Sequence, residues 1–516
     1  MSSITEHSEN LIESRVEAHD SQQFEVKLDY SIDPKKRRNQ YRVEAYIFIP
    51  KSLGINRDTY STEHFFRDTQ SYIRFKTPSI DLKDLLSPGA QHSPFIRLKS
   101  ALATLGDKPT SEPARRKLLR ELKLLACQVR ANMRDRIRDL VERLPEPDSA
   151  QKNEEASLSE SAICEVVSEI KMVFEAYRNL KPELLHKGVG FEIQDTYQKV
   201  DEYLSLVLEN HLTHLYEALE ELYDETLFAT ARVQSSQLLR DERDYRDASD
   251  YPRILEGGVP NEHYLYRRGL LKKMAMSVLF LKVNKEDSGD GHSDLIASIA
   301  AGVAMVFAVF TGIWAQMSYG LNTGPFIVAL VLSYVLKDRI KDWIKRYYSA
   351  FIAYRLWDRS TQIIDPTHGG AVGRCREQVE HLSKSKVPAS VLKNRHAGEP
   401  DSVEAQAKQE SCIRYNKEIR LDGKNIDLNH GRLSDVNDIM RFNIWRMLIL
   451  ADDPKHDVRL FNVKQGQVET VVCPKVYHLN ILLRFYSGLG HELVSSERVR
   501  VVFDRDGIRH LDLLNA

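Results

Sequence analysis

The feature that most constrains this chain is a long stretch without charge. From Leu295 to Leu336, 42 residues contain no Asp, Glu, Lys or Arg, although 28% of the 516 residues are charged. The first part, LIASIAAGVAMVFAVFTGIWAQM, would extend about 34 Å as a helix, enough to cross the hydrocarbon core of a bilayer. The sequence therefore predicts a transmembrane helix here, with a buried core helix as the alternative.

The second part of the uncharged stretch is shorter. A turn containing Gly320 and Pro325 separates the two parts. Counted from Leu321, the second part offers about 16 uncharged residues, roughly 24 Å, and Lys337 can extend toward the headgroups. Because the chain beyond is again rich in charge, we expect it to return across the bilayer, giving a two-span transmembrane hairpin over residues 295–336.

Basic residues flank both ends of this expected hairpin, and its loop carries none. They are Arg267, Arg268, Lys272, Lys273, Lys282 and Lys285 before it, and Lys337, Arg339, Lys341, Lys345, Arg346, Arg355 and Arg359 after it. The positive-inside rule then places both flanks and both termini in the cytoplasm, in a multi-pass protein of the inner (plasma) membrane.

The segment after the expected hairpin reads KDRIKDWIKRYYSAFIAYRLW, with apolar positions recurring every three or four residues. This spacing predicts an amphipathic helix, whose aromatic and basic residues suit a headgroup layer of anionic lipid. A stalk that packs against another helix is the alternative. The residues predicted at the membrane interface are Lys337, Arg339, Lys341, Trp343, Lys345, Arg346 and Tyr347.

Upstream, residues 22–50 contain two alternating runs, FEVKLDYSI and YRVEAYIFIP, which predict a β-hairpin. The basic cluster Lys35–Arg38 falls in its loop, where an exposed turn is the simplest interpretation and nucleic-acid contact the alternative. With 73 basic and 74 acidic side chains, the net charge gives no strong indication of nucleic acid.

Long amphipathic helices are expected next. One stripe comprises Leu118, Leu122, Leu125, Val129, Met133, Ile137, Leu140 and Leu144. Further helices are expected over about 159–181, 193–240 and 261–283, which together indicate a helical bundle or coiled coil able to form a homo-oligomer.

Strand-like runs fill the C-terminal part, including IRYNKEIRL, VYHLNILLRFYS and RVRVVFDRDGIRHLDLL, whereas a helix is expected to start near Ser434. The expected fold class is an integral membrane α+β protein with an N-terminal β-hairpin, a long-helix bundle, the two-span hairpin and a small C-terminal α+β domain with an antiparallel sheet. The expected divisions are a polar tail (1–21), β-hairpin and loop-rich region (22–110), cytoplasmic helical bundle (111–285), transmembrane hairpin (295–336), juxtamembrane helix and loop (337–384), polar linker (385–411) and C-terminal domain (412–516).

Residue patterns that could carry chemistry are sparse. The five cysteines are scattered without a C-x-x-C pair, and His211 and His214 lack a partner ligand motif, so no metal or cofactor is predicted. In THGGAVGR, the residues His368, Gly369 and Gly370 are weak candidates for an anion-binding loop before a helix near Ala371, with a capping loop as the alternative.

Three functional classes follow. The first is a membrane-anchored scaffold or sensor whose two large cytoplasmic domains bind a protein or small-molecule partner. The second is an oligomeric two-span channel or membrane-disrupting effector, in which Gly302, Gly312 and Gln316 pack or line a shared interface. The third is a membrane-tethered enzyme with its site in the C-terminal domain, for which no catalytic residue is identified. A lipid bilayer is the expected partner in all three.

Overall fold

The computed structural model describes residues 13–78, 80–87, 93–107, 111–145, 154–185, 190–223, 226–252, 261–286, 290–319, 323–353, 357–396, 409–430, 435–463, 466–488 and 492–514. It divides into two compact units. The sheet unit is drawn from residues 1–73, 281–429 and 434–516, and the helical unit from residues 74–280 and 430–433.

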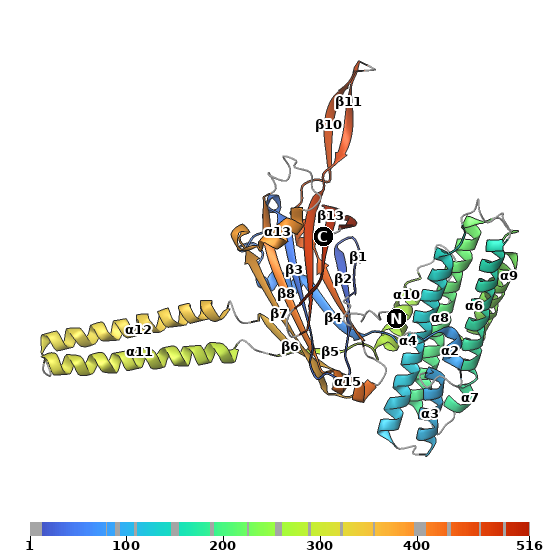
Figure 1. The fold of residues 1–516 in the computed structure, drawn as a ribbon, viewed down its shortest axis with the longest axis horizontal. Helices are drawn as coiled ribbons and strands as arrows, with labels where there is room; N and C mark the ends of the chain where they lie inside the picture. Colours follow the sequence, from blue (N-terminus) through green and yellow to red (C-terminus); the bar gives the residue numbers. More distant parts are fainter. Residues whose placement is uncertain are drawn as a thin grey trace, which may run out of the picture. The chain divides into compact units, whose positions relative to one another are not determined.

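The sheet unit contains an antiparallel sheet of eight strands in the order β14-β13-β12-β3-β8-β7-β6-β5 (Figure 1). In that order the strands cover Gly507–Leu514, Glu492–Asp504, Tyr477–Ser487, Asn39–Pro50, Glu410–Leu421, Ala371–Leu382, Arg359–Ile364 and Lys282–Glu286. Segments from the beginning, middle and end of the chain therefore build one sheet.

A second sheet has four strands in the order β1-β2-β9-β4, and β10 and β11 form a separate two-stranded ribbon. The strands of the second sheet are Glu13–Ala18, Gln23–Ser31, Asp435–Asn443 and Thr69–Phe75, and those of the ribbon are Lys455–Asn462 and Gln467–Pro474. The short helices are α1 (Thr62–Asp68), α13 (Ala389–His396), α15 (Gly423–His430) and α16 (Trp445–Leu448).

Three expectations about this region are wrong. The runs over 22–50 form no hairpin with each other, because β2 pairs with β1 and β9 while β3 pairs with β12 and β8. The C-terminal strands form no separate domain, because β12 and β8 pair with the N-terminal β3. The helix expected near Ser434 is also wrong: β9 covers Asp435–Asn443, and only the four-residue α16 follows.

The two larger sheets face each other across an aromatic core. Tyr415 on β8 lies 6.1 Å from Phe442 on β9 between ring centroids, and Phe65 of α1 lies within 6.0 Å of both rings. Tyr30 on β2 stacks on Tyr41 of β3 at 4.6 Å. On β2 the buried apolar residues Phe24, Val26, Leu28 and Tyr30 alternate along the strand, as the period of two in β-strands requires.

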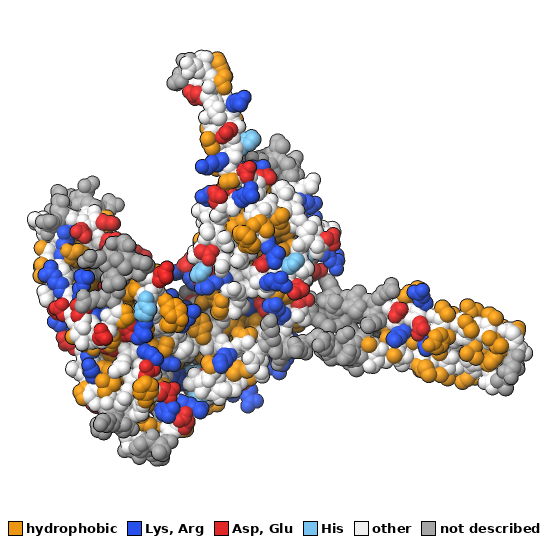
Figure 2. Space-filling view, turned by 180° about the vertical axis from the view of Figure 1, so that it is seen from behind, with side chains coloured by type: hydrophobic (Ala, Val, Ile, Leu, Met, Phe, Trp, Pro, Cys, Tyr) orange, Lys and Arg blue, Asp and Glu red, His pale blue; other side chains and the backbone are white. Residues whose placement is uncertain are grey.

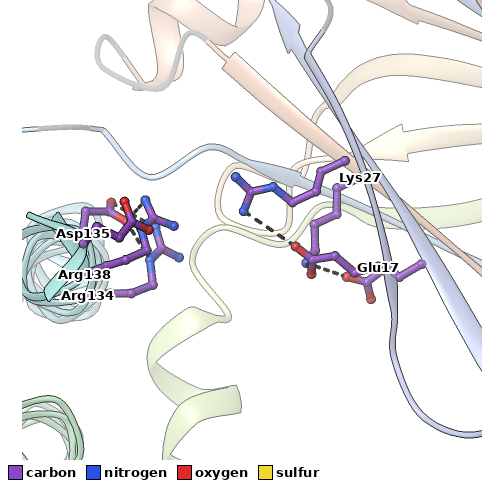
Figure 3. Close-up of polar contacts among 8 residues, drawn as sticks. Glu17, Lys27, Arg134, Asp135 and Arg138 are labelled. Atoms are coloured by element: carbon purple, nitrogen blue, oxygen red, sulfur yellow. Dashed lines mark hydrogen bonds and ion pairs between the residues drawn. The ribbon is translucent and has the colours of Figure 1, made fainter. Parts of the chain in front are cut away.

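The outer face of the four-stranded sheet carries a charged ladder. Glu17 on β1 lies directly opposite Glu25 on β2, an arrangement that would be repulsive by itself. Lys27 offsets it by contacting Glu17 at 2.8 Å and Glu25 at 3.1 Å, and Arg441 of β9 reaches Glu25 at 2.5 Å (Figure 3). The ladder thus holds β1, β2 and β9 together at their polar surface.

The helical unit is a bundle around one hydrophobic core (Figure 1). Its helices are α2 (Leu82–Leu86), α3 (Pro94–Asp107), α4 (Glu112–Glu142), α6 (Glu154–Arg178), α7 (Lys181–Leu184), α8 (Phe191–Leu222), α9 (Ala229–Ala248) and α10 (Glu262–Met276). The apolar stripe of α4 faces this core, and its polar side carries exposed pairs such as Asp135 with Arg134 at 2.9 Å and Arg138 at 3.4 Å (Figure 3).

Helix boundaries in this unit differ from those expected. The single helix expected over 193–240 is two helices, because Tyr223 is extended and Phe228 adopts a left-handed backbone conformation with φ of 57° between α8 and α9. The helix expected over 261–283 ends at Met276, and the chain continues into β5. The break at Phe228 lets α9 pack back against α8 and α6.

The uncharged stretch forms most of α11 (Asp290–Tyr319) and the first part of α12 (Gly324–Ala353), and these two helices lie side by side (Figure 1). Among the described residues, one helical segment, Ala297–Tyr319, is long and apolar enough to cross a membrane. The prediction of a two-span membrane protein is therefore wrong. Before Lys337, α12 offers roughly 13 uncharged residues, or about 20 Å, which is short of a hydrocarbon core of about 30 Å.

Candidate functional site

The first candidate site is the apolar surface of α11. Its side chains form an open groove with a volume of about 530 Å³, lined by Val303, Val306, Phe307, Phe310, Thr311 and Trp314. Phe310 is 76% exposed and Met317 83% exposed. Figure 2 shows hydrophobic side chains gathered along the paired helices. Exposed apolar area of this extent marks a surface that contacts lipid or another protein.

Small residues form the contact between α11 and α12. Ala300, Ala304 and Ala315 are almost completely buried, and the hydroxyl of Thr311 hydrogen-bonds with that of Ser333. Alanine allows helix backbones to approach closely, and a hydroxyl pair joins them without an unpaired polar group. These residues join α11 and α12 within one chain.

The residues predicted for span packing lie elsewhere on α11. Gly302 and Gln316 are exposed, Gly312 is half-buried, and a Cβ atom added at either glycine would meet no atom within 4 Å. Their proposed role in contacts between copies stays a prediction.

The basic end of α12 follows the apolar part directly. Lys337 places its ammonium 4.1 Å from the ring centroid of Tyr334, and Arg339 and Lys341 are exposed. Trp343 is 71% exposed. The side chains of Lys345, Arg346 and Tyr347 lie outside the described part of the structure, although these positions belong to α12.

The predicted anion loop has a different geometry. His368, Gly369 and Gly370 lie in the turn between β6 and β7, where the Gly369 N–H donates to the Asp365 carbonyl at 2.8 Å. Gly369 has φ of 70°, which glycine adopts without strain. The helix expected near Ala371 is wrong, because β7 starts there. The helix N-terminus on which anion binding depended is therefore missing from this loop.

The second candidate site is a polar pocket in the helical unit. It has a volume of about 350 Å³, within the range of small-molecule sites. Its lining comes from four helices and the chain after α9: Lys181, Asp195, Tyr197, Gln198, Lys199, Asp201, Glu202, Tyr245, Ala248, Ser249, Asp250, Tyr251, Pro252 and Arg267. We call it the Asp201 pocket.

Asp201 organises this pocket from the middle of α8. It is only 2% exposed, and its Oδ2 atom accepts hydrogen bonds from the hydroxyls of Tyr245 and Tyr251, each at 2.7 Å. Its Oδ1 atom lies 3.4 Å from the Nε atom of Arg178. That guanidinium also binds Glu242 at 2.7 Å and lies 3.5 Å from the ring centroid of Tyr245. One carboxylate thus connects α6, α8 and α9.

The end of α9 brings Tyr251 to Asp201. The N–H of Tyr251 donates to the carbonyl of Arg246, and that of Asp250 donates to Asp247, which are the two bonds of a Schellman motif. Asp250 occupies the left-handed position of the motif with φ of 55°, a conformation that aspartate tolerates better than most residues. The helix cap therefore directs Tyr251 back across the pocket.

The tyrosines of the pocket remain protonated over the ordinary pH range. Burial, together with the charge of Asp201, raises the pKa of Tyr245 to about 12. The same two causes raise the pKa of Tyr251 and of Tyr197. Tyr245 and Tyr251 therefore act as hydrogen-bond donors to Asp201.

Sequence reasoning did not find this pocket. Asp201 falls within the apolar stripe of α8, four residues after Tyr197 and three before Leu204, and a charge in such a position could have drawn attention to it. Its partners come from other helices, however, and spacing along the chain cannot bring those together.

His211 and His214 also lie on α8. Burial, followed by the charges of Arg130, Arg134, His214 and Arg268, lowers the pKa of His211 to about 4. His211 is therefore neutral at pH 7.

This depressed pKa predicts a pH dependence of stability. Between about pH 6.5 and 4 the unfolded chain binds the proton that folded His211 refuses, so the free energy of unfolding falls as the pH is lowered. We expect a loss of about 2 kcal/mol between pH 7.5 and 5, and a smaller loss for His211→Gln. Urea unfolding followed by circular dichroism at both pH values measures the difference; equal losses in the two proteins would contradict the prediction.

Comparison with known protein families and with curated proteins found no match to this chain.

Proposed function

We propose that this protein is attached to a lipid bilayer through α11 and acts there as a scaffold or sensor, with the Asp201 pocket as its ligand site. The observation that supports attachment is the exposed apolar surface of Ala297–Tyr319, which is about 34 Å long. Leaving such a surface in water would be unfavourable by about 25 cal/mol for each Å² of apolar area.

The surroundings of α11 fit this proposal. Lys337, Arg339 and Lys341 suit anionic headgroups, each contributing up to about 1 kcal/mol near a charged membrane surface. Trp343 is amphipathic and suits the same boundary. The bilayer partner is therefore best tested with vesicles that contain anionic lipid.

Strand pairing supports one orientation of the sheet unit. Along the chain, β5 comes just before α11 and β6 comes just after α12. These two strands pair antiparallel, with Lys282 opposite Ile364 at one end and Glu286 opposite Ser360 at the other. This pairing keeps the sheet unit next to the N-terminal end of α11, so the sheet unit stays on the side of the bilayer from which α11 enters. The basic flanks make the cytoplasmic side of a plasma membrane our proposal.

Vesicle flotation of the full chain tests the attachment. We expect Phe310→Asp to lower the partition coefficient into vesicles roughly a hundredfold, because an Asp in the centre of a membrane helix costs about 3 kcal/mol relative to Phe. The matched control is Phe191→Asp, the same exchange at a residue of the helical unit that is 82% exposed. The control should float like the unchanged protein.

A second copy of the chain is the alternative cover for α11, as the expected homo-oligomer would require. In that case the protein purified without detergent would form a defined oligomer by light scattering and remain at the bottom of the flotation gradient. Phe310→Asp would then dissociate the oligomer. This combination of results would replace membrane attachment by self-association.

A further inference from the structure

The chemistry of the Asp201 pocket indicates the class of its ligand. We propose that the pocket binds a small organic cation with N–H donors, such as a primary ammonium or guanidinium group. This inference rests on the proposed function, in which the pocket is the ligand site. The inference depends on which hydrogen-bonding capacities the pocket leaves open.

Two of the tyrosines offer acceptors. A phenol has a single O–H proton, and Tyr245 and Tyr251 both give theirs to Oδ2 of Asp201. Toward a ligand their oxygens can only accept. Hydrogen-bond donors on the ligand are therefore favoured at Tyr251, and at Tyr245 beside the Ser249 hydroxyl that already approaches its oxygen.

Tyr197 adds a group that lacks a partner. It is 2% exposed, it lines the pocket, and its hydroxyl has no hydrogen-bond partner among the described residues. A buried hydroxyl without a partner costs about 1–3 kcal/mol. The ring is held in place by stacking on Tyr177 at 4.9 Å, so the hydroxyl cannot readily turn away. A polar ligand group in the pocket, whether a donor or an acceptor, would satisfy it.

The charges of the lining are mostly neutralised within it. Lys199 pairs with Asp195 at 2.6 Å, and Arg267 binds Glu202 through two bonds of 2.9 and 2.7 Å. Asp250 forms no ion pair within the described part of the chain, and it lies at the exposed rim. A cation that enters would meet this carboxylate together with the tyrosine oxygens.

Lys181 is the lining group that opposes this reading. It is exposed and forms no ion pair among the described residues, so it could instead favour an anion. The Tyr245 ring and the Asp201 carboxylate already bind one organic cation, because the guanidinium of Arg178 lies against both. Aromatic faces combined with carboxylates are a common environment for organic cations.

Isothermal titration calorimetry of the full chain in detergent tests the proposal with three four-carbon probes: putrescine, the neutral 1,4-butanediol and the anionic succinate. We expect putrescine to bind at least ten times more tightly than the other two. Succinate binding as tight as putrescine binding, or no putrescine isotherm up to about 10 mM, would overturn the proposal.

Two variants locate the binding. Tyr197→Phe removes only the hydroxyl, and we expect it to weaken putrescine binding about tenfold. Asp250→Asn removes the charge but keeps a residue that tolerates the left-handed conformation, and we expect a threefold to tenfold loss. Tyr266→Phe is the matched control, because Tyr266 is 68% exposed on α10 and does not line the pocket.

The variants also decide between sites. If Tyr197→Phe and Asp250→Asn both bind putrescine like the unchanged protein, the cation binds elsewhere and the assignment fails. Should Tyr197→Phe unfold, Asp250→Asn alone carries the test, because its side chain is exposed. Flotation of the same samples reports membrane attachment independently, so failure of the ligand class and failure of the attachment are distinguishable.

Discussion

Replacing Lys417 with methionine is expected to lower the free energy of unfolding of the sheet unit by about 3–5 kcal/mol, because it leaves a buried carboxylate without its cation. Lys417 on β8 and Asp438 on β9 are both 0% exposed, and their charged atoms lie 2.7 Å apart. The ammonium also donates to the hydroxyl of Ser71 on β4 at 2.6 Å. The pair therefore joins the eight-stranded sheet to the four-stranded one.

The protonation state of this pair depends on the surrounding charges. Burial acts against the charge of Lys417, but the carboxylates of Asp438 and Glu377 outweigh it and raise the pKa of the ammonium. Burial raises the pKa of Asp438, while Lys417 acts in the opposite direction. Lys417 thus keeps its proton. When Lys417 is replaced, burial raises the pKa of Asp438 without the opposing effect of the ammonium.

Urea unfolding followed by tyrosine and tryptophan fluorescence measures this effect. The matched control is Arg505→Met, which breaks an exposed pair with Asp453 and should cost less than about 1 kcal/mol. Combining Lys417→Met with Asp438→Leu should restore most of the stability, because an apolar pair can replace a buried ion pair at little cost. A double variant that is less stable than Lys417→Met would contradict this explanation, because it would show that an unpaired Asp438 is not the cause of the loss.

The Lys417 pair shows what a strand pattern can and cannot predict. In IRYNKEIRL the period of two places Lys417 on the same face as Tyr415 and Ile419, so a charge inside the core was visible in the sequence. Its partner was not, because Asp438 lies in a segment that we expected to be helical. There, Val436, Ile439 and Met440 fit a helical period, whereas Val436, Met440 and Phe442 fit a strand period, so spacing alone did not decide between them.

Strand pairing was the largest source of error in the predicted fold. The prediction joined β2 to β3 because they are neighbours in the chain, as most hairpin strands are. The observed partners are far away: β3 pairs with β8, so that Tyr46 lies opposite Arg414, and β2 pairs with β9, so that Val26 lies opposite Met440. No local pattern specifies contacts over nearly the whole chain length.

Helices with long apolar stripes were easier to predict. The stripe from Leu118 gave the position of α4, and the uncharged stretch gave α11, because periodicity and charge are properties of a single segment. The prediction of a second span failed on the length of the uncharged helix, because Lys337 follows too soon after Gly324. Predicting the Asp201 pocket would have required knowing which residues of α6, α8 and α9 are in contact, and spacing along the sequence does not show this.

Replacing Asp201 with alanine should destabilise the helical unit by about 3–5 kcal/mol, since it removes the acceptor of two tyrosine hydroxyls and one carboxylate beside Arg178. The matched control is Asp195→Ala on the same helix. It breaks an exposed pair with Lys199 four residues later, worth about 0.3–0.5 kcal/mol.

The loss of helical circular dichroism in urea measures both variants. A third variant, Tyr245→Phe with Tyr251→Phe, separates the contributions at Asp201: it removes both phenol donors but leaves the contact with Arg178. If those two bonds carry most of the effect, the double variant will lose nearly as much stability as Asp201→Ala. A small loss would instead attribute the effect to the charge of Arg178, whose remaining carboxylate partner among the described residues would be Glu242 after Asp201 is removed. Equal, small losses in Asp201→Ala and Asp195→Ala would contradict the central role of Asp201 in joining α6, α8 and α9.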